Sequence, residues 1–331
     1  MTLAFVSPAN PHGLNASRVL GSFDVGVLSR DSALPWPVQS VLTPVLDGGD
    51  APMHEAWLTD EVVERGEADD LAWCRSAELL FGVVTMAEAD VPASDGASAL
   101  CVLGERAYAR IFRLLDAMGV PHLWRVWNYI PDINGEQAGL ERYQQFNRGR
   151  GAAFERCARS VTEQVPAACA LGVPGGPLSI AFLAGRSPLR SVENPRQVSA
   201  YHYPHVYGPR SPTFSRAALA NVGSQEWLFV SGTASIVGHE SRHLGDVVAQ
   251  TLESIDNVAA VLAEVARHSR TGGYALEALN YRVYLRHAAD AQAVRTAVTG
   301  RVGQAHVLCV QADICRRELL VEIEAVGSQT C

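Results

Sequence analysis

Apolar and polar positions alternate most clearly near the C-terminal end of the chain. In residues 318–326 one set holds Leu319, Val321, Ile323 and Ala325, and the other holds Leu320, Glu322, Glu324 and Val326. Because successive side chains of a strand point to opposite faces, the pattern predicts a strand with one apolar face and one acidic face. The apolar run 305–311 precedes it across a polar turn, so we predict a hairpin over residues 305–326. A plain edge strand with a solvated acidic face remains an alternative.

Other apolar patterns predict an alternation of helices and strands. The 3.6-residue period predicts helices over residues 105–118, 140–158, 246–268 and 291–298. Short apolar runs predict strands over residues 79–85, 122–130, 226–231 and 276–286. The Pro-, Asn- and Ser-rich start, residues 1–21, predicts irregular structure. Gly149 inside the second helix costs about 1 kcal/mol relative to alanine, which indicates either a close ligand or a kink.

The chain contains two copies of one pattern. Trp-Arg-Val-Trp at 124–127 matches Tyr-Arg-Val-Tyr at 281–284 with an offset of 157 (282 − 125). The strands that end at Gly185 and Gly327 match with an offset of 142 (327 − 185), which sets Ile180 opposite Glu322 and Val173 opposite Cys315. Each copy is predicted to run helix, strand, helix, strand, strand. We therefore predict an α+β fold with a degenerate domain at residues 1–190 and a catalytic domain at residues 191–331.

Composition narrows the class of protein. The 331 residues are enough for two domains with sizeable cores. Seven cysteines without framework spacing indicate reduced thiols in a cytoplasmic enzyme. The net charge of −8 argues against nucleic acid as a partner, and no apolar run approaches the roughly 20 residues of a membrane span. The first 13 residues have neither the basic start nor the apolar core of a signal peptide.

One short motif suggests zinc but lies in the wrong context. His-Glu-Ser-Arg-His at 239–243 matches H-E-x-x-H, which binds zinc only when a helix places both histidines on one face. Here Gly238 and Gly245 enclose the motif, and the long helix begins after it. We therefore predict a loop and no metal site.

Longer strings carry a family resemblance. Residues 232–235, 245–250, 256–257, 283–286 and 320–325 resemble the YjgF/RidA fold. The two-copy arrangement, with residues 142–150 and the aromatic strings of 203–217, more specifically resembles the chorismatases. The resemblance covers nearly all of the second copy and about half of the first. It implies two tandem YjgF/RidA-like (chorismate-mutase-like) domains, mixed sheets with helices packed on one face, and sites at domain interfaces. The small relatives are trimeric, so both a monomeric pseudo-trimer and a trimer remain open.

The resemblance also implies an activity. Chorismatases cleave the enolpyruvyl ether of chorismate, release pyruvate and need no cofactor. The pairing of Gly232 with Cys315 is similar to the members that form 3-hydroxybenzoate, which makes Glu322 the acid and Cys315 the thiol that directs the aromatic product. Alternatives are a chorismate hydrolase that gives a dihydroxycyclohexadiene carboxylate and a non-catalytic RidA-like ligand-binding protein. An imine deaminase is disfavoured, because residues 306–308 lack the arginine of that group.

The chemistry of an enol ether agrees with these residues. Its cleavage needs protonation at carbon, and a carboxylic acid in an apolar strand stays protonated near neutral pH, as we expect for Glu322. Arg316 and Arg317 are expected to lower the pKa of the Cys315 thiol. Arginines suit the two substrate carboxylates, and tyrosines can line a pocket for a ring. The predicted substrate-binding residues are Arg150, Tyr203, Tyr207, Arg216, Gly232, Tyr281 and Arg286.

Overall fold

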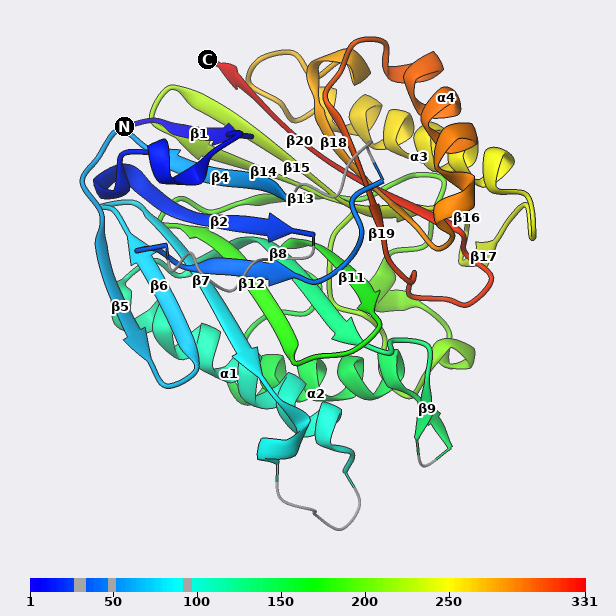
Figure 1. The fold of residues 1–331 in the computed structure, drawn as a ribbon, viewed down its shortest axis with the longest axis horizontal. Coiled ribbons are helices and arrows are strands. Elements are labelled where there is room, and N and C mark those ends of the chain that lie inside the picture. Colours follow the sequence, from blue (N-terminus) through cyan, green and yellow to red (C-terminus); the bar gives the residue numbers. More distant parts are fainter. Residues whose placement is uncertain (27–33, 47–51, 92–96, 138) are drawn as a thin grey trace.

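Two six-stranded sheets of the same topology form most of the molecule. The computed structural model describes residues 1–26, 34–46, 52–91, 97–137 and 139–331 (Figure 1). The first sheet has the order β11-β8-β12-β7-β6-β5, and the second has the order β19-β18-β20-β15-β14-β13. The first comprises β5 (Glu64–Ala68), β6 (Leu71–Arg75), β7 (Leu79–Met86), β8 (His122–Pro131), β11 (Ala167–Val173) and β12 (Leu178–Gly185). The second comprises β13 (Arg190–Val192), β14 (Ala217–Val222), β15 (Gln225–Ala234), β18 (Asn280–Leu285), β19 (Val307–Gln311) and β20 (Val321–Thr330).

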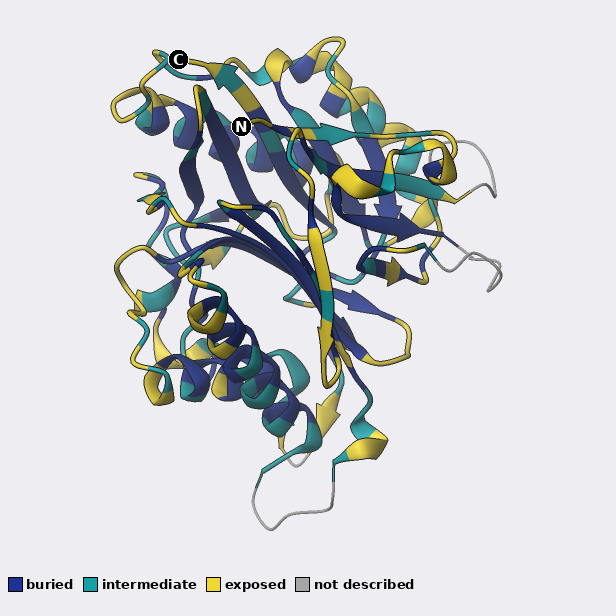
Figure 2. Ribbon diagram, turned by 90° about the vertical axis from the view of Figure 1, so that its left-hand side faces the viewer, coloured by how far each residue is buried: buried dark blue, intermediate teal, exposed yellow. Residues whose placement is uncertain are grey.

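Two helices cover the outer face of each sheet, so the predicted α+β fold with mixed sheets is confirmed. These are α1 (Ala99–Met118) and α2 (Arg142–Arg156) on the first sheet, and α3 (Val247–Ala266) and α4 (Ala291–Val302) on the second. The inner sides of the helices are buried and their outer sides exposed (Figure 2). Helix α1 begins six residues before its predicted start (105 − 99), because the Ser98 side chain accepts a hydrogen bond from the Cys101 backbone N–H. No helix in the described residues is both long and apolar enough to span a bilayer.

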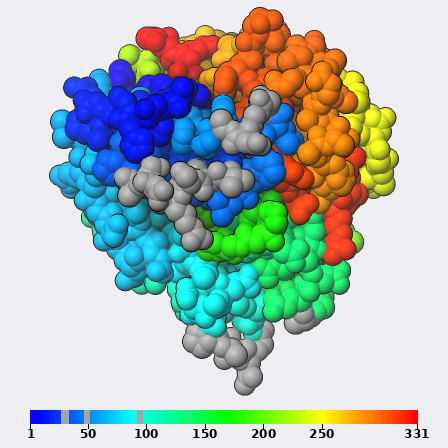
Figure 3. Space-filling view, in the orientation of Figure 1, coloured from blue at the N-terminus to red at the C-terminus, as the bar shows by residue number. Residues whose placement is uncertain are grey.

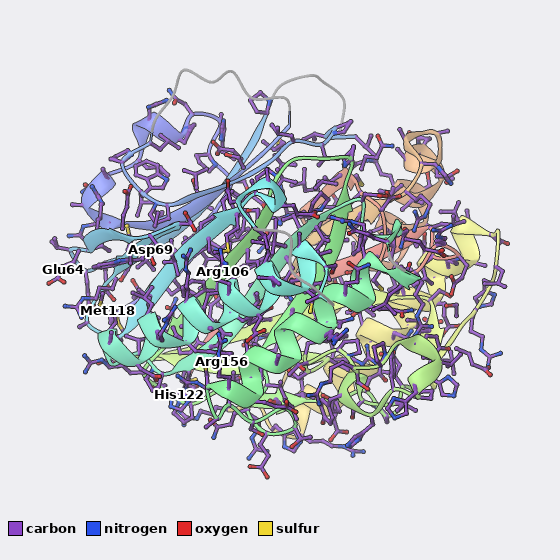
Figure 4. All side chains as sticks on the ribbon, turned by 90° about the horizontal axis from the view of Figure 1, so that it is seen from below. Glu64, Asp69, Arg106, Met118, His122 and Arg156 are labelled. Carbon is purple, nitrogen blue, oxygen red and sulfur yellow. The ribbon has the colours of Figure 1, made fainter. Side chains whose placement is uncertain are left out.

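The glycine inside α2 is explained by helix packing. Viewed from below, α1 and α2 lie side by side across the first sheet (Figure 4). A Cβ atom on Gly149 would lie 2.0 Å from the backbone oxygen of Cys101 in α1. Only a residue without a side chain allows the two backbones to approach so closely. Neither a kink nor a ligand is needed, and α2 continues through this position.

The strand at residues 321–330 has the predicted faces but not the predicted partner. Val321, Ile323 and Ala325 pack into the core beneath α3 and α4, while Glu322 and Glu324 lie on the opposite face. The hairpin prediction is wrong, because β18 lies between β19 and β20. Helix α4 carries the chain from β18 to β19, and such a crossover makes the two strands parallel. The loop 312–320 then passes the end of β18 to reach its other edge.

Strand pairing corrects the alignment of the two copies. Both run helix, strand, helix, strand, strand, as predicted, apart from the short β9 and β10. Glu322 pairs with Tyr284, and Trp127, which matches Tyr284 between the copies, pairs with Ala181. The offset is therefore 141 (322 − 181), and Ala181 rather than Ile180 is the counterpart of Glu322. A shift of one residue reverses the face of a strand, and Ile180 indeed packs toward the helices of the first copy.

Residues before the first large sheet form a third, smaller sheet. It comprises β1 (Leu3–Val6), β2 (Val19–Val25), β3 (Val38–Val41) and β4 (Met53–Thr59). Its order β3-β2-β4-β1 and strand directions repeat those of β19-β18-β20-β15. The prediction of irregular structure at residues 1–21 is thus wrong for β1 and the start of β2. The inner faces of all three sheets share one core, and the N-terminal segment (blue) adjoins both larger copies in Figure 3.

Candidate active site

A pocket lies where the two larger copies meet. It encloses about 460 Å³, a size that suits a ring-bearing small molecule. The first copy contributes β9 (Glu136–Gln137), β10 (Leu140–Glu141) and the start of α2. The second contributes β15, loop 312–320 and β20, and segment 199–216 closes one side. The pocket residues used below are Tyr143, Tyr203, Tyr207, Phe214, Arg216, Gly232, Cys315, Arg316 and Glu322.

The carboxyl group of Glu322 lines this pocket in its acid form. Glu322 is 4% exposed, and no described residue forms a hydrogen bond with its carboxyl group. Burial, followed by the negative charge of Glu324, raises the pKa of Glu322 to about 8, although Arg125 and Arg216 oppose the shift. Glu322 therefore carries its proton at neutral pH and can act as a general acid.

A bulge in β15 brings Gly232 against this acid. The register of β15 with β20 shifts between Val230 and Thr233. A Cβ atom on Gly232 would lie 1.8 Å from Glu322 Oε1. A bulge often re-aims the backbone beside a functional site, and here it leaves room for the carboxyl group only because residue 232 has no side chain.

Cys315 lies in the loop 312–320 and also lines the pocket. Burial, followed by the charge of Glu322, raises the pKa of its thiol to about 12, and the weaker effect of Arg316 does not reverse this. The prediction of a lowered thiol pKa is therefore wrong, because the cost of desolvating the thiolate exceeds its attraction to Arg316. With the corrected offset, the counterpart of Cys315 is Pro174 (315 − 141) rather than Val173.

Arg216, which lies immediately before β14, places its positive charge in the pocket. Arg216 Nη2 donates to the Tyr203 hydroxyl and to the Val198 carbonyl oxygen, both at 2.8 Å. Its guanidinium also lies over the rings of Tyr203 and Phe214. Among the described residues, its Nε has no hydrogen-bond partner. The side chain is thus held rigidly and still has an N–H to offer to an anion.

A second cation, Arg316, approaches from loop 312–320. Its guanidinium stacks 3.9 Å from the ring centre of Tyr207, and its Nη1 donates to the His239 carbonyl oxygen at 2.9 Å and to Ser241 Oγ at 3.1 Å. Its Nη2 is buried and has no partner among the described residues. The sequence presented Arg316 only as a neighbour of the thiol. Its contacts come from segments more than 70 positions away, which no local pattern could indicate.

Three predicted substrate-binding residues lie outside the pocket. Arg286 pairs with Asp313 and holds loop 312–320 through further bonds to that loop's backbone. Arg150 is buried on α2, and the Tyr281 hydroxyl donates to the Leu276 carbonyl oxygen beneath the helices of the second copy. Tyr203, Tyr207, Arg216 and Gly232 do line the pocket. Tyr143 and Phe214 were missed as individual residues, although both lie within the strings that carry the family resemblance.

The histidine motif lies outside any helix, as predicted. It begins in the turn after β16 (Ile236–Val237) and includes β17 (Glu240–Ser241), and these two strands form a ribbon. His239 Nδ1 lies 3.3 Å from the Tyr207 hydroxyl, and His243 Nε2 lies 3.2 Å from a Glu253 carboxylate oxygen. Within the described residues, no three His, Cys, Asp or Glu side chains are grouped as a metal site would require. The ribbon instead supplies the oxygens that hold Arg316.

Comparison with known proteins identifies the family. The chain is 40% identical over 287 residues to a 3-hydroxybenzoate synthase of Streptomyces hygroscopicus, covering 83% of this chain and 81% of that protein. The chain belongs to the chorismatase family. A chorismatase of Streptomyces rapamycinicus is also 40% identical, over 84% of this chain and 83% of its own. Residues 55–184 match the family model of the chorismatase FkbO/Hyg5-like N-terminal domain. A chorismatase crystal structure matches with a TM-score of 0.86 and 32% identity, covering 98% of each chain.

Proposed function

We propose that this protein cleaves the enolpyruvyl ether of chorismate to pyruvate and 3-hydroxybenzoate. The observation that carries the proposal is a buried carboxylic acid, Glu322, in a pocket that also holds two arginines, each with an N–H group that no described residue accepts. Chorismate has two carboxylates, which the two arginines can bind, and an acid-labile enol ether, which the carboxylic acid can protonate. The printed names of the relatives, 3-hydroxybenzoate synthase and chorismatase, support the same substrate.

In the proposed reaction, Glu322 protonates the methylene carbon of the enolpyruvyl group. The resulting oxocarbenium ion weakens the bond between the ring and the ether oxygen, and that bond then breaks to release pyruvate. Arg216 and Arg316 hold the two carboxylates, and Tyr203 and Tyr207 line the ring. Formation of 3-hydroxybenzoate consumes no water, so the oxygen of the substrate's own 4-hydroxyl group bonds to the C3 carbon that the ether oxygen has left. The bond between this oxygen and C4 then breaks. Loss of the C3 proton completes the aromatic ring, and this proton can return to the Glu322 carboxylate.

Cys315 is the proposed determinant of the product. Hydrolysis would add one water and give a dihydroxycyclohexadiene carboxylate, whereas the aromatic product requires that water be kept away. A neutral, largely apolar thiol beside the acid suits this task better than a thiolate would. The acid, Gly232 and Cys315 all belong to residues 191–331, which we propose as the catalytic domain.

Incubation of the purified protein with chorismate tests the proposal. Pyruvate is followed with lactate dehydrogenase and NADH, and the ring product is compared by chromatography with authentic standards. Pyruvate together with 3-hydroxybenzoate supports the proposal. Pyruvate with the diene acid would favour the hydrolase alternative, and chorismate binding without pyruvate would favour a ligand-binding protein.

A further inference from the structure

Two ion pairs are buried between the sheets, and one of them contains Glu324, which lies two positions from the acid. Arg125 of β8 binds Glu324 of β20, and Trp127 Nε1 donates to the same carboxylate at 3.2 Å. Arg282 of β18 binds Glu55 of β4 and also lies 3.4 Å from Glu324. All four charged residues are buried. Two positive and two negative charges therefore compensate one another, although Arg125 Nη1 and Arg282 Nε have no hydrogen-bond partner among the described residues.

The two pairs are the same contact repeated in different sheets. In the strand register of its own sheet, Glu324 lies opposite Arg282, and Glu55 lies opposite Phe23. In each case the glutamate, at the equivalent strand position, receives an arginine from another sheet. Glu324 receives Arg125 from the first large sheet, and Glu55 receives Arg282 from the second. Glu55 therefore occupies the position of Glu324 in the third sheet. The surroundings of the two glutamates differ at one position. The residue two positions before Glu55 is Met53, whereas the residue two positions before Glu324 is the acid Glu322.

Glu322 and Glu324 lie two positions apart on one face of β20, so both carboxyl groups point toward the same buried layer. The other ionisable groups near Glu322 come from β8, β11, β18, the start of β14, α2 and loop 312–320. They are Arg125, Cys169, Arg282, Tyr284, Arg216, Tyr143 and Cys315. The thiols and phenols are neutral because burial raises their pKa values. Arg125 is already bound, and Arg216 faces the pocket.

We propose that Glu324 is a positioning residue whose arginine-bound negative charge keeps Glu322 in its acid form between turnovers. An ionised Glu322 would be desolvated and would also face the like charge of Glu324 at short range in a medium of low dielectric constant, although Arg125 and Arg216 attract it. Protonation removes both costs. The use of this acid in turnover rests on the proposed function, whereas its state of ionisation does not.

Infrared titration of the protein without substrate tests the inference. The carbonyl absorption of the Glu322 acid is the band that is lost in Glu322→Gln. In Glu324→Gln the like charge is gone and Arg125 lacks its partner, so Glu322 should ionise at least one pH unit lower. Above the midpoint, that shift is about a tenfold loss of the acid form at a given pH. The basic limb of pyruvate release should move by the same amount.

Two companion variants separate electrostatics from structure. Arg125→Gln alone should move the titration to higher pH, because an attracting cation is lost while Glu324 keeps its charge. The double variant Arg125→Gln/Glu324→Gln should return it close to wild type, since replacing both members of a buried pair is tolerated better than removing one. These two variants still decide the matter if Glu324→Gln does not fold. If the Arg125–Glu324 pair had a purely structural role, both variants would be less stable, and the titration of Glu322 would not move in either.

Glu55→Gln is the matched control. It removes an equivalent buried glutamate from an equivalent arginine on another sheet. The fraction of Glu322 in its acid form at a given pH should therefore change by less than about threefold. A folded Glu324→Gln with the wild-type titration would overturn the inference, as would equal shifts in Glu324→Gln and Glu55→Gln. If the wild type does not cleave chorismate, the proposed function fails, and the infrared titration still judges the role of Glu324.

Discussion

Replacement of Gly232 by alanine tests the placement of the acid most directly. The new methyl group would lie 1.8 Å from Glu322 Oε1, 2.7 Å from its Cδ and 3.1 Å from Cys169 Cβ. Unbonded heavy atoms prefer separations of roughly 3.5 Å, so the carboxyl group must move by about 1.5–2 Å. Gly232 is not in the left-handed region, so the backbone itself accepts alanine. The perturbation therefore acts on the neighbouring side chains.

A displacement of about 1 Å at a reacting group can cost on the order of 10²-fold in rate, so we expect at least that loss in pyruvate release from Gly232→Ala. Overpacking should cost about 1–3 kcal/mol in stability, which leaves a folded protein for assay. Gly175→Ala is the control, because its Cβ atom would meet no atom within 4 Å. If folded Gly232→Ala released pyruvate within threefold of wild type and gave the same ring product, Glu322 could not be the acid in this geometry.

Four further predictions concern the same site. Glu322→Gln should lower pyruvate release by at least about 10²-fold and leave circular dichroism unchanged; a loss of only a few-fold would contradict the assignment. Because burial raises the pKa of Glu322 from its ordinary value of 4.5 to about 8, the folded wild-type protein loses stability as pH rises between these values, by up to about 1.4 kcal/mol per pH unit. The glutamine variant should therefore melt at a higher temperature than wild type at pH 8 and at a similar temperature below pH 4.5. Cys315→Ala should still release pyruvate but yield less 3-hydroxybenzoate, with the diene acid or an isomer in its place; an unchanged chromatogram would remove the thiol from the mechanism. EDTA should leave activity intact and elemental analysis should find no stoichiometric zinc, whereas tightly bound zinc essential for turnover would show that residues 239–243 had been misjudged.

Local patterns in the sequence determined the elements and the face on which each side chain lies. Helical periodicity placed the four helices within a few residues, apart from the start of α1 and the end of α4. Alternation put Glu322 and Glu324 together on the face of β20 opposite Val321 and Ile323, because side-chain direction in a strand depends only on position along it. The resemblance strings located Tyr203, Tyr207, Arg216 and Gly232, all of which line the pocket.

The tertiary structure alone decided which strands are neighbours. The short β1–β4 sheet has no α-helix in its described residues and therefore no long periodic signal, and β18 separates two strands that are consecutive in sequence. Register is also a property of pairing, so an alignment by sequence was displaced by one residue and gave Glu322 the wrong counterpart.

The sequence alone did not determine which arginines can bind an anion at the site, nor the direction in which the pKa of Cys315 shifts. Nothing in the sequence distinguishes Arg286 from Arg316 as an anion ligand. In the structure, Arg286 donates its hydrogen bonds to the backbone of loop 312–320, while Arg316 keeps an N–H without a partner among the described residues. Cys315 is followed by two arginines, yet burial raises the pKa of its thiol. The cause is physical: desolvation and ion pairing depend on groups brought together from distant parts of the chain, whereas periodicity depends only on neighbours in sequence.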